Sequence, residues 1–277
     1  MRTENKLFPP VIKWSGSKRR VAWQLASMAP SHNRYFEPFV GGGALIPAVR
    51  PATGKISDSM PELMSLWQAI RDEPTALAEN YGLHWTRLQR TGHEYYYQVR
   101  ESFNKSKTPA ELLFLSRTCV NGLIRFNSRG EFNNSLHHSR PGIHPDTLTR
   151  IIHEWSSLVK NLETSCEDYE QAVSGATEGD FVFLDPPYAG TRGRYRPEKF
   201  DFDRLCRVLK SLTDRGVKWM LTLDGTAGGR EYRESLPPLP SKYTFAVNTG
   251  HSPFTRLMGS SLDLVSESVH LNFDPRS

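Results

Sequence analysis

Several short runs of apolar residues have the length of β-strands and end at a polar or turn-forming residue. The clearest is the run of four at residues 181–184, which stands directly before Asp185. A continuous apolar run of this length is typical of a strand that is buried on both faces, as in a parallel sheet. Similar patterns predict further strands at residues 35–40, around Ile56 and ending at Asp58, at 217–223 and at 269–273.

Apolar positions three and four residues apart predict helices between these strands. This spacing covers residues 61–70 and most of 73–121, where Leu112, Leu115 and Cys119 show it. Two further helices are expected, one at 145–160 beginning near His144-Pro145 and one at 201–214. Residues 122–145 are rich in Gly, Asn, Ser and His, which favours loops or a hairpin there.

Alternating strands and helices predict an α/β fold with a mostly parallel sheet. The long helical stretch interrupts this alternation and is interpreted as an insertion. We therefore divide the chain into a first part of the sheet domain (residues 1–59), an inserted, mostly helical domain (60–145) and a second part of the sheet domain (146–277).

The residues Asp185-Pro186-Pro187-Tyr188 carry the most specific candidate chemistry. In open α/β sheets, ligands bind beyond the carboxyl ends of the strands, so a carboxylate at this position faces a site. The prolines lack N–H donors and leave their carbonyls as acceptors, and the tyrosine adds a flat ring with a polar tip. This set suits a planar base with an exocyclic amine, although a strand-ending turn explains the tetrapeptide equally well.

Two segments nearer the N-terminus are weaker candidates. Gly41-Gly42-Gly43 follows a predicted strand, with Glu37 just before it and Asp58 at the end of the next strand. Glycines let a backbone pass close to a ligand, and an acid at the second strand end often binds ribose hydroxyls, but a tight structural turn is an equal alternative. In residues 13–18 (Lys-Trp-Ser-Gly-Ser-Lys), Trp14 could pack on an adenine ring and Lys18 could pair with a carboxylate, although the segment on its own favours a surface turn followed by a helix.

Charge is distributed unevenly along the chain. The net charge is +5, and residues 85–150 hold ten Lys and Arg against five Asp and Glu, an excess equal to the charge of the whole chain. A basic segment beside a near-neutral remainder suits a polyanionic partner, although charge alone is explained as well by a solvated face. The three cysteines are widely spaced, which argues against a disulfide framework or a zinc site, and we expect neither a signal peptide nor a membrane span.

The order of these motifs resembles one known family. Lys-Trp-x-Gly-x-Lys, Phe-Glu-Pro-Phe-Val-Gly-Gly-Gly, Asp58 and Asp-Pro-Pro-Tyr follow one another as in the Dam-type, α-class adenine-N6 DNA methyltransferases, the D12 family. Residues 121–133 (Asn-Gly-Leu-Ile-Arg-Phe-Asn-Ser-Arg-Gly-Glu-Phe-Asn) resemble the signature of that family's DNA-recognition domain. The likeness spans residues 8–273 and implies a Rossmann-like, S-adenosylmethionine-dependent methyltransferase sheet with an inserted DNA-recognition domain.

The resemblance implies roles for residues at matching positions. A methyl group would pass from S-adenosylmethionine to N6 of a flipped-out adenine in double-stranded DNA. The residues that match catalytic positions are Asp185, Pro186 and Tyr188. Those that match cofactor-binding positions are Trp14, Lys18, Glu37, Gly41, Asp58, Asp168, Tyr169 and Asp185. The expected DNA-binding residues are Asn121, Arg125, Asn127, Arg129, His138, Arg140, Arg192 and Arg194.

The chain also departs from the family's pattern. Family members that methylate GATC carry an aromatic residue where this chain has Val120, and Val-Pro-Phe-Gly where this chain has residues 134–137 (Asn-Ser-Leu-His). We therefore expect a recognition site that need not be GATC. Adjacent histidines without nearby Cys or acidic ligands are a poor metal pattern, so no metal is expected.

The sequence leaves three functions open. The chain is an active adenine-specific enzyme, a catalytically inactive DNA-binding relative, or a methyltransferase that acts on RNA or on protein glutamine. Asp185, in place of asparagine, and the basic insertion favour the first. For that enzyme we expect double-stranded DNA as the partner, a monomer, and a location in the cytoplasm of a bacterial cell or phage-infected host.

Overall fold

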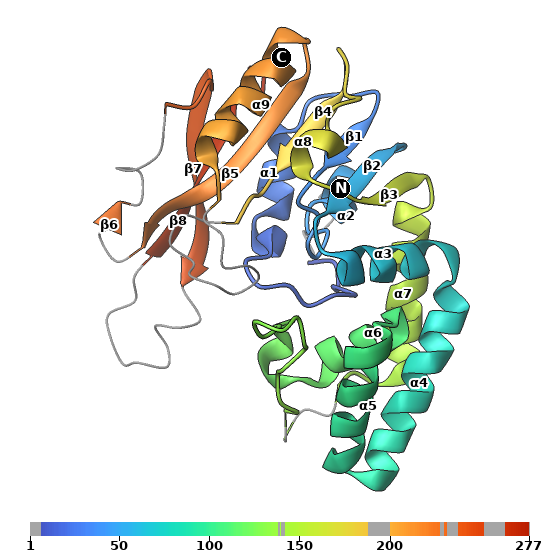
Figure 1. The fold of residues 1–277 in the computed structure, drawn as a ribbon. Coiled ribbons are helices and arrows are strands. Elements are labelled where there is room, and N and C mark those ends of the chain that lie inside the picture. Colours follow the sequence, from blue (N-terminus) through green and yellow to red (C-terminus); the bar gives the residue numbers. More distant parts are fainter. Residues whose placement is uncertain are drawn as a thin grey trace, which may run out of the picture.

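A single twisted sheet forms the centre of the computed structural model (Figure 1), which describes residues 7–137, 139, 142–187, 200–227, 230–231, 238–251 and 264–276. Seven strands lie in the order β3-β2-β1-β4-β5-β8-β7, and a short strand, β6, pairs with β5. Their bounds are β1 Tyr35–Glu37, β2 Gly54–Asp58, β3 Leu162–Cys166, β4 Phe181–Leu184, β5 Lys218–Ala227, β6 Arg230–Glu231, β7 Tyr243–His251 and β8 Leu264–Leu271.

The strands from β3 to β5 are parallel, as the sequence predicts, and β8 and β7 are antiparallel additions. The chain runs outward from β1 through β2 to β3, then returns to β4 on the other side of β1. The strand order therefore reverses between β1 and β4. In open α/β sheets this reversal opens a crevice at the carboxyl ends of the strands, where ligands bind.

Side chains alternate between two buried faces of the sheet. Phe181 and Phe183 of β4 belong to one core cluster, and Val182 and Leu184 belong to the other. The helices α8 (Tyr169–Ala172) and α9 (Phe202–Asp214) pack on the second face, and Figure 1 shows α9 lying along β5. The helices α1 (Ala22–Met28) and α2 (Ile46–Val49) contribute to the first, and the short 3₁₀ helix η1 (Lys18–Arg20) directly precedes α1.

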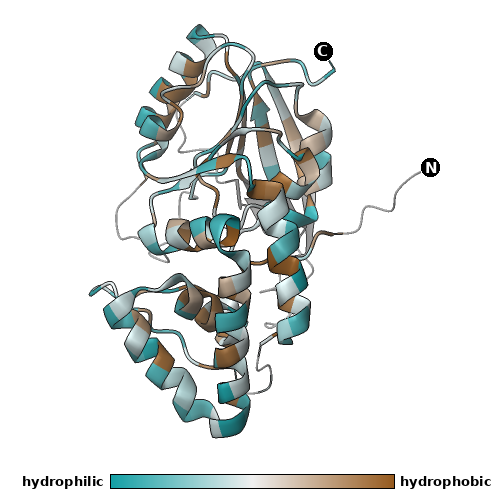
Figure 2. Ribbon diagram, turned by 90° about the vertical axis from the view of Figure 1, so that its right-hand side faces the viewer, coloured by the Kyte–Doolittle hydropathy of each residue, from teal (hydrophilic) through white to brown (hydrophobic). Residues whose placement is uncertain are grey.

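The predicted helical stretch forms a layer beside the sheet (Figure 1). It contains α3 (Pro61–Asp72), α4 (Pro74–Thr91), α5 (His93–Ser106), α6 (Pro109–Thr118) and η2 (Val120–Gly122), and α7 (Pro145–Val159) leads back to the sheet. Hydrophobic residues concentrate on the strands and on the inward sides of the helices in Figure 2. One continuous core runs from Phe181 in β4 through Trp67 in α3 to Phe103 in α5, so the helical layer and the sheet share their packing.

The helix predictions hold with small shifts at their ends. The expected helices at 61–70, 145–160 and 201–214 are observed as α3, α7 and α9, and the His144 side chain accepts the N-terminal hydrogen bond of α7. Pro145 then begins that helix, where its missing N–H costs nothing.

The ends of three predicted strands were wrong. The strand expected at 217–223 runs on to Ala227 as β5, and the short strand β6 was not predicted. The first strand ends at Glu37, because Pro38 follows and has no N–H for the ladder, and the last begins at Leu264 rather than 269. The edge strands β3 and β7 were not predicted. Edge strands are buried less completely than central ones, and β3 has only Leu162 fully buried, so its apolar signal is weak.

Candidate active site at the carboxyl edge of the sheet

A row of polar side chains interrupts the first apolar face of the sheet where β1 and β4 end, beside the middle of β5. Tyr35 and Glu37 share one face of β1, and Asp185 continues the alternation of β4 onto that same face. Thr222 of β5 lies opposite Val269 of β8, and Glu267 is two residues before Val269, so both also point to this face. The strand register thus collects these five side chains at one edge of an otherwise apolar layer.

Lys18 lies over this row from η1 and is almost completely buried, with 2% of its surface exposed. Its Nζ lies 2.8 Å from Asp185 Oδ1 and 3.7 Å from Glu267 Oε1, and it donates a hydrogen bond of 3.1 Å to the carbonyl of Gly16. The interpretation of residues 13–18 as a plain surface turn is therefore wrong for Lys18. A buried ammonium needs charged partners, which the two acids supply.

Asp185 is held by two donors on the same oxygen. Besides Lys18, the Thr222 hydroxyl donates to Asp185 Oδ1 at 2.8 Å. Two fixed donors orient the plane of the carboxylate, and 19% of the side chain remains exposed at the end of β4. Pro186 is buried and Pro187 exposed, whereas Tyr188 lies outside the described residues.

Glu37 is a buried carboxyl group beside this pair. It is 2% exposed and accepts a hydrogen bond of 2.8 Å from the Tyr35 hydroxyl. Burial, together with the smaller effect of the Asp185 charge, raises the pKa of Glu37 to about 8, although the Tyr35 hydrogen bond acts in the opposite direction. At neutral pH Glu37 is therefore mainly a neutral acid.

The glycine loop after β1 packs tightly against two tryptophans. Gly41 has φ +46°, and a Cβ on it would lie 2.6 Å from Trp14 Nε1. The Trp67 indole donates to the Gly41 carbonyl at 3.0 Å, and the Gly41 N–H donates to Asp58 Oδ2 at 3.3 Å. Asp58 also accepts from the Met60 N–H at 3.2 Å, so its carboxylate ties the end of β2 to the loop.

Asp168 and Tyr169 follow β3 at the same edge. Asp168 caps α8 and forms an ion pair with Arg204 at 2.5 Å. The Tyr169 ring stacks on Phe39 with centroids 5.2 Å apart, and the Arg204 guanidinium lies 5.0 Å from the ring centroid. The Tyr169 hydroxyl is buried and has no hydrogen-bond partner among the described residues. An aromatic cluster with an unsatisfied polar atom suits the edge of a planar ligand.

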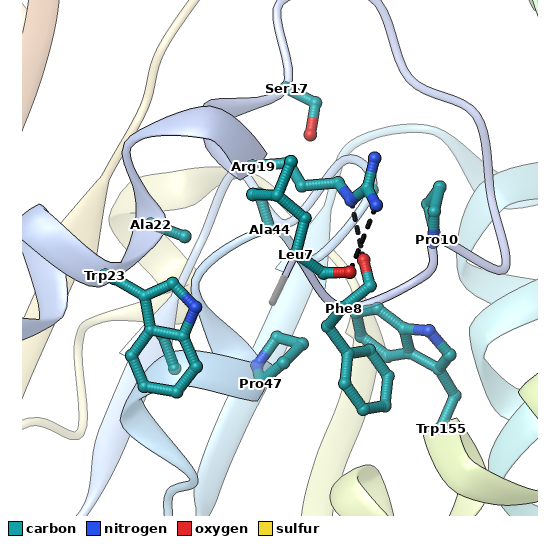
Figure 3. A pocket seen from close by; sticks show the side chains of 12 residues that line it. Leu7, Phe8, Pro10, Ser17, Arg19, Ala22, Trp23, Ala44, Pro47 and Trp155 are labelled. Carbon is teal, nitrogen blue, oxygen red and sulfur yellow. Dashed lines mark hydrogen bonds between the residues drawn. The ribbon is translucent and has the colours of Figure 1, made fainter. Parts of the chain in front are cut away.

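A separate apolar pocket lies behind the glycine loop (Figure 3), between the N-terminal segment and α1, α2 and α7. Arg19 donates from Nε to the Phe8 carbonyl at 2.6 Å and from Nη2 to the Leu7 carbonyl at 3.2 Å, which holds that segment in place. Trp23 and Trp155 line it, but none of the acids of the sheet edge does. The pocket therefore supports the loop and takes no part in the chemistry of the edge.

The signature at 121–133 folds as a small hairpin whose polar side chains partly hold its own turn. Phe126 and Phe132 form its bridge. The Asn127 side-chain oxygen accepts from the N–H groups of Arg129 and Glu131, and its amide donates to Glu131 Oε2 at 2.8 Å. In this structure Asn127 builds the turn, and Arg129 is exposed and pairs with Glu131.

Arg125 stands exposed on the flank of this hairpin. Its Nε donates to Asn133 Oδ1 at 2.8 Å, which fixes the direction of the guanidinium. Exposed Asn121 adopts a left-handed backbone (φ +57°) beside buried Gly122. The remaining predicted DNA contacts, His138, Arg140, Arg192 and Arg194, lie outside the described residues.

Three functional candidates escaped the sequence analysis. Thr222 was visible as the one polar residue inside the apolar run 219–223, which is a usable signal, and Glu267 lay where no element was predicted. The third is Asn134, which is buried and donates to the carbonyls of Val120 and Leu123 at 2.9 and 3.0 Å. It therefore braces the loop just before Arg125, at a position where the sequence departs from its family.

The described part of the chain contains neither a candidate metal centre nor a membrane-spanning helix. There, no group of three or more His, Cys, Asp or Glu side chains is placed to hold a metal ion. Within the same residues, no helix has the length and apolar character needed to cross a membrane.

The whole chain was compared with known proteins. A family model for D12 class N6 adenine-specific DNA methyltransferases matches residues 14–239. The chain belongs to this family.

Its relatives include a type II methyltransferase of Lactococcus lactis subsp. cremoris, which is 31% identical over 77% of this chain and 80% of its own length. A type II methyltransferase of Methanocaldococcus jannaschii is 30% identical over 77% of this chain and 83% of its own. The DNA adenine methylase of Escherichia coli K12 is 27% identical, with 86% and 90% covered. The D12 match thus covers the helical layer and the sheet strands from β1 to β5.

Proposed function

We propose that this D12 methyltransferase moves a methyl group from S-adenosylmethionine to N6 of an adenine in duplex DNA, with Asp185 and the Pro186 carbonyl receiving the amine. The observation that carries the proposal is the orientation of Asp185 by Lys18 and Thr222 at the carboxyl edge of the sheet. An adenine amine is a weak nucleophile, because its lone pair is delocalised into the ring. Two acceptors on its hydrogens localise that pair and aim it. After transfer, the nitrogen passes one of its two protons to the Asp185 carboxylate, which already accepts its hydrogen bond.

The cofactor would lie along the same edge, from the glycine loop to Tyr169. S-adenosylmethionine supplies a methyl group that its sulfonium has already activated. Two features suit a cationic ligand of this size: the Asp58 carboxylate lies beside the glycine loop, where it accepts from the Gly41 N–H, and the Gly41 backbone lies where no side chain fits. Trp14 would pack on the cofactor, and Asp168 with Tyr169 would contact its adenine.

The inserted segment 60–145 would bind the DNA. The basic excess of residues 85–150, most of which lie in this segment, suits phosphates. Arg125, directed by Asn133, presents a guanidinium outward as base readout requires. A base in a stacked duplex is out of reach of Asp185, so the adenine would be flipped out at a cost of a few kcal/mol. Tyr188 would stack on the flipped adenine, and Arg192 and Arg194 would bind neighbouring phosphates. The reaction would take place in the cytoplasm, where the DNA is.

We further propose that the recognition site need not be GATC. Val120 cannot stack as an aromatic residue does. Asn134 stands in a position that is apolar in the GATC enzymes, and there it braces the loop that leads to Arg125. A differently braced loop would offer the bases a different set of contacts.

The test is transfer of tritium from labelled S-adenosylmethionine to duplex DNA. The wild type is expected to label adenine, and Asp185→Ala is expected to lose transfer while retaining duplex binding, because phosphate contacts supply most of the affinity. Label appearing only in RNA or protein, or no label from a folded wild type that binds DNA, would contradict the proposal. Near-normal turnover by Asp185→Ala would contradict the mechanism alone.

A further inference from the structure

Glu267 of β8 forms an ion pair with Lys18 at the carboxyl edge of the sheet, but the proposed methyl transfer gives it no role. We propose that Glu267 is a positioning residue, which holds Lys18 against Asp185 and so fixes the carboxylate that receives the adenine amine. This rests on the proposed function, since it concerns the same carboxylate.

The first support is the geometry around the Lys18 ammonium. An ammonium has three N–H donors. Around Lys18 Nζ stand Asp185 Oδ1 at 2.8 Å, the Gly16 carbonyl at 3.1 Å and Glu267 Oε1 at 3.7 Å, each on a different segment of the chain. The two shorter contacts are hydrogen bonds, and the third is an ion pair. The three contacts together fix the position of Lys18 Nζ, so loss of Glu267 would allow this nitrogen to shift.

The second support is the balance of buried charge. Lys18 is 2% exposed and Glu267 13% exposed, so water compensates little of either charge. If Asp185 were the sole counter-ion, the lysine would compete with the substrate amine for its carboxylate. Glu267 compensates part of the positive charge of Lys18. Asp185 can then accept a hydrogen bond from the substrate amine while Lys18 stays charged and in place.

The third support is the register that brings Glu267 there. In the antiparallel pair β5–β8, Thr222 lies opposite Val269, and Glu267 points to the same face two residues earlier. Thr222 holds Asp185 directly, at 2.8 Å, and Glu267 reaches the same carboxylate through Lys18. The antiparallel extension of the sheet therefore supports the residue that ends the parallel strand β4.

The experiment compares Glu267→Gln with a matched control, Glu163→Gln. Glu163 also lies in a strand of the sheet and has a lysine partner at 3.6 Å, but it is 68% exposed. The wild type and both variants are assayed for methyl transfer to duplex DNA, with thermal melting and cofactor binding by calorimetry to confirm folding. We expect Glu267→Gln to lower kcat about tenfold with KM for S-adenosylmethionine and DNA nearly unchanged, and the control to match the wild type.

Two further variants test whether the effect passes through Lys18. Glu267→Asp keeps the charge and should recover part of the lost kcat. In a Lys18→Met background, Glu267→Gln should cause no further loss, because the group through which it acts is gone. Neither Gln nor Asp changes the volume of the side chain much. If one of the two variants fails to fold, the other can still be compared with the wild type.

Some results would overturn the inference. They are an unchanged kcat in Glu267→Gln, a loss confined to KM for the cofactor, an equal loss in the Glu163 control, or a loss that simply adds to that of Lys18→Met. Each of these leaves the proposed function standing if the wild type methylates DNA. A wild type that methylates no DNA overturns the proposed function, and this inference with it.

Discussion

Glu37 makes the stability of the protein depend on pH in a direction that can be measured. Its pKa in the folded chain is about 8, against an ordinary value of 4.5, because it is buried beside Asp185. Between these two values the unfolded chain has released the Glu37 proton and the folded chain still holds it. The free energy of unfolding therefore falls as pH rises through this window. Glu37→Gln, which keeps the shape and an acceptor for Tyr35, should remove that dependence.

The size of the effect follows from the shift. Each unit of pKa difference corresponds to about 1.4 kcal/mol. The loss of unfolding free energy that the raised pKa of Glu37 causes is small at pH 5, just above the pKa in the unfolded chain. It is nearly complete at pH 8, where the carboxyl group of the folded chain is half ionised. Over this range the wild type should lose about 3 kcal/mol relative to Glu37→Gln.

The assay is urea unfolding followed by tryptophan fluorescence, at pH 5, 6, 7 and 8 and without cofactor. The measured quantity is the difference in unfolding free energy between Glu37→Gln and the wild type, which should grow steadily with pH. Glu163→Gln serves as the control, because that side chain is 68% exposed and its charge is solvated. A difference for Glu37→Gln that stays constant from pH 5 to pH 8 would refute the reasoning, since it would mean that the carboxyl is already ionised at pH 5.

Three further predictions concern ligands. Gly41→Ala should weaken S-adenosylmethionine binding by about tenfold or more, because the new Cβ would meet Trp14 Nε1 at 2.6 Å and the backbone has φ +46°; calorimetry that shows unchanged affinity would count against it. Arg125→Ala should cost about 1–3 kcal/mol of DNA binding and relax specificity at one base pair, whereas a uniform loss with a shallower salt dependence would identify a phosphate contact instead. Expression in a host without adenine methylation, followed by mapping of modified adenines, should reveal sites other than GATC; methylation confined to GATC would disprove the role assigned to Val120 and Asn134.

Local patterns in the sequence were enough to predict the parallel sheet and the family. The apolar run of β4, the helical spacing of α3 and α7, and the order of motifs from Trp14 to Asp185 all depend on residues that are near one another in the chain. The strand-to-loop transition at Asp185 could be predicted for the same reason. The edge strands β3 and β7 were missed, because a strand with one partner is less completely buried and carries a weaker apolar pattern.

Tertiary structure decided which of the charged residues act together. The sequence allowed Lys18 to pair with a carboxylate, yet only the packing of η1 on the sheet buries it and makes Asp185 and Glu267 its partners. Glu267 reaches the same point only because β8 pairs antiparallel with β5 in one register, and a shift of one residue would turn it to the opposite face. Contacts between residues far apart in sequence depend on such register and on packing, which no local pattern encodes.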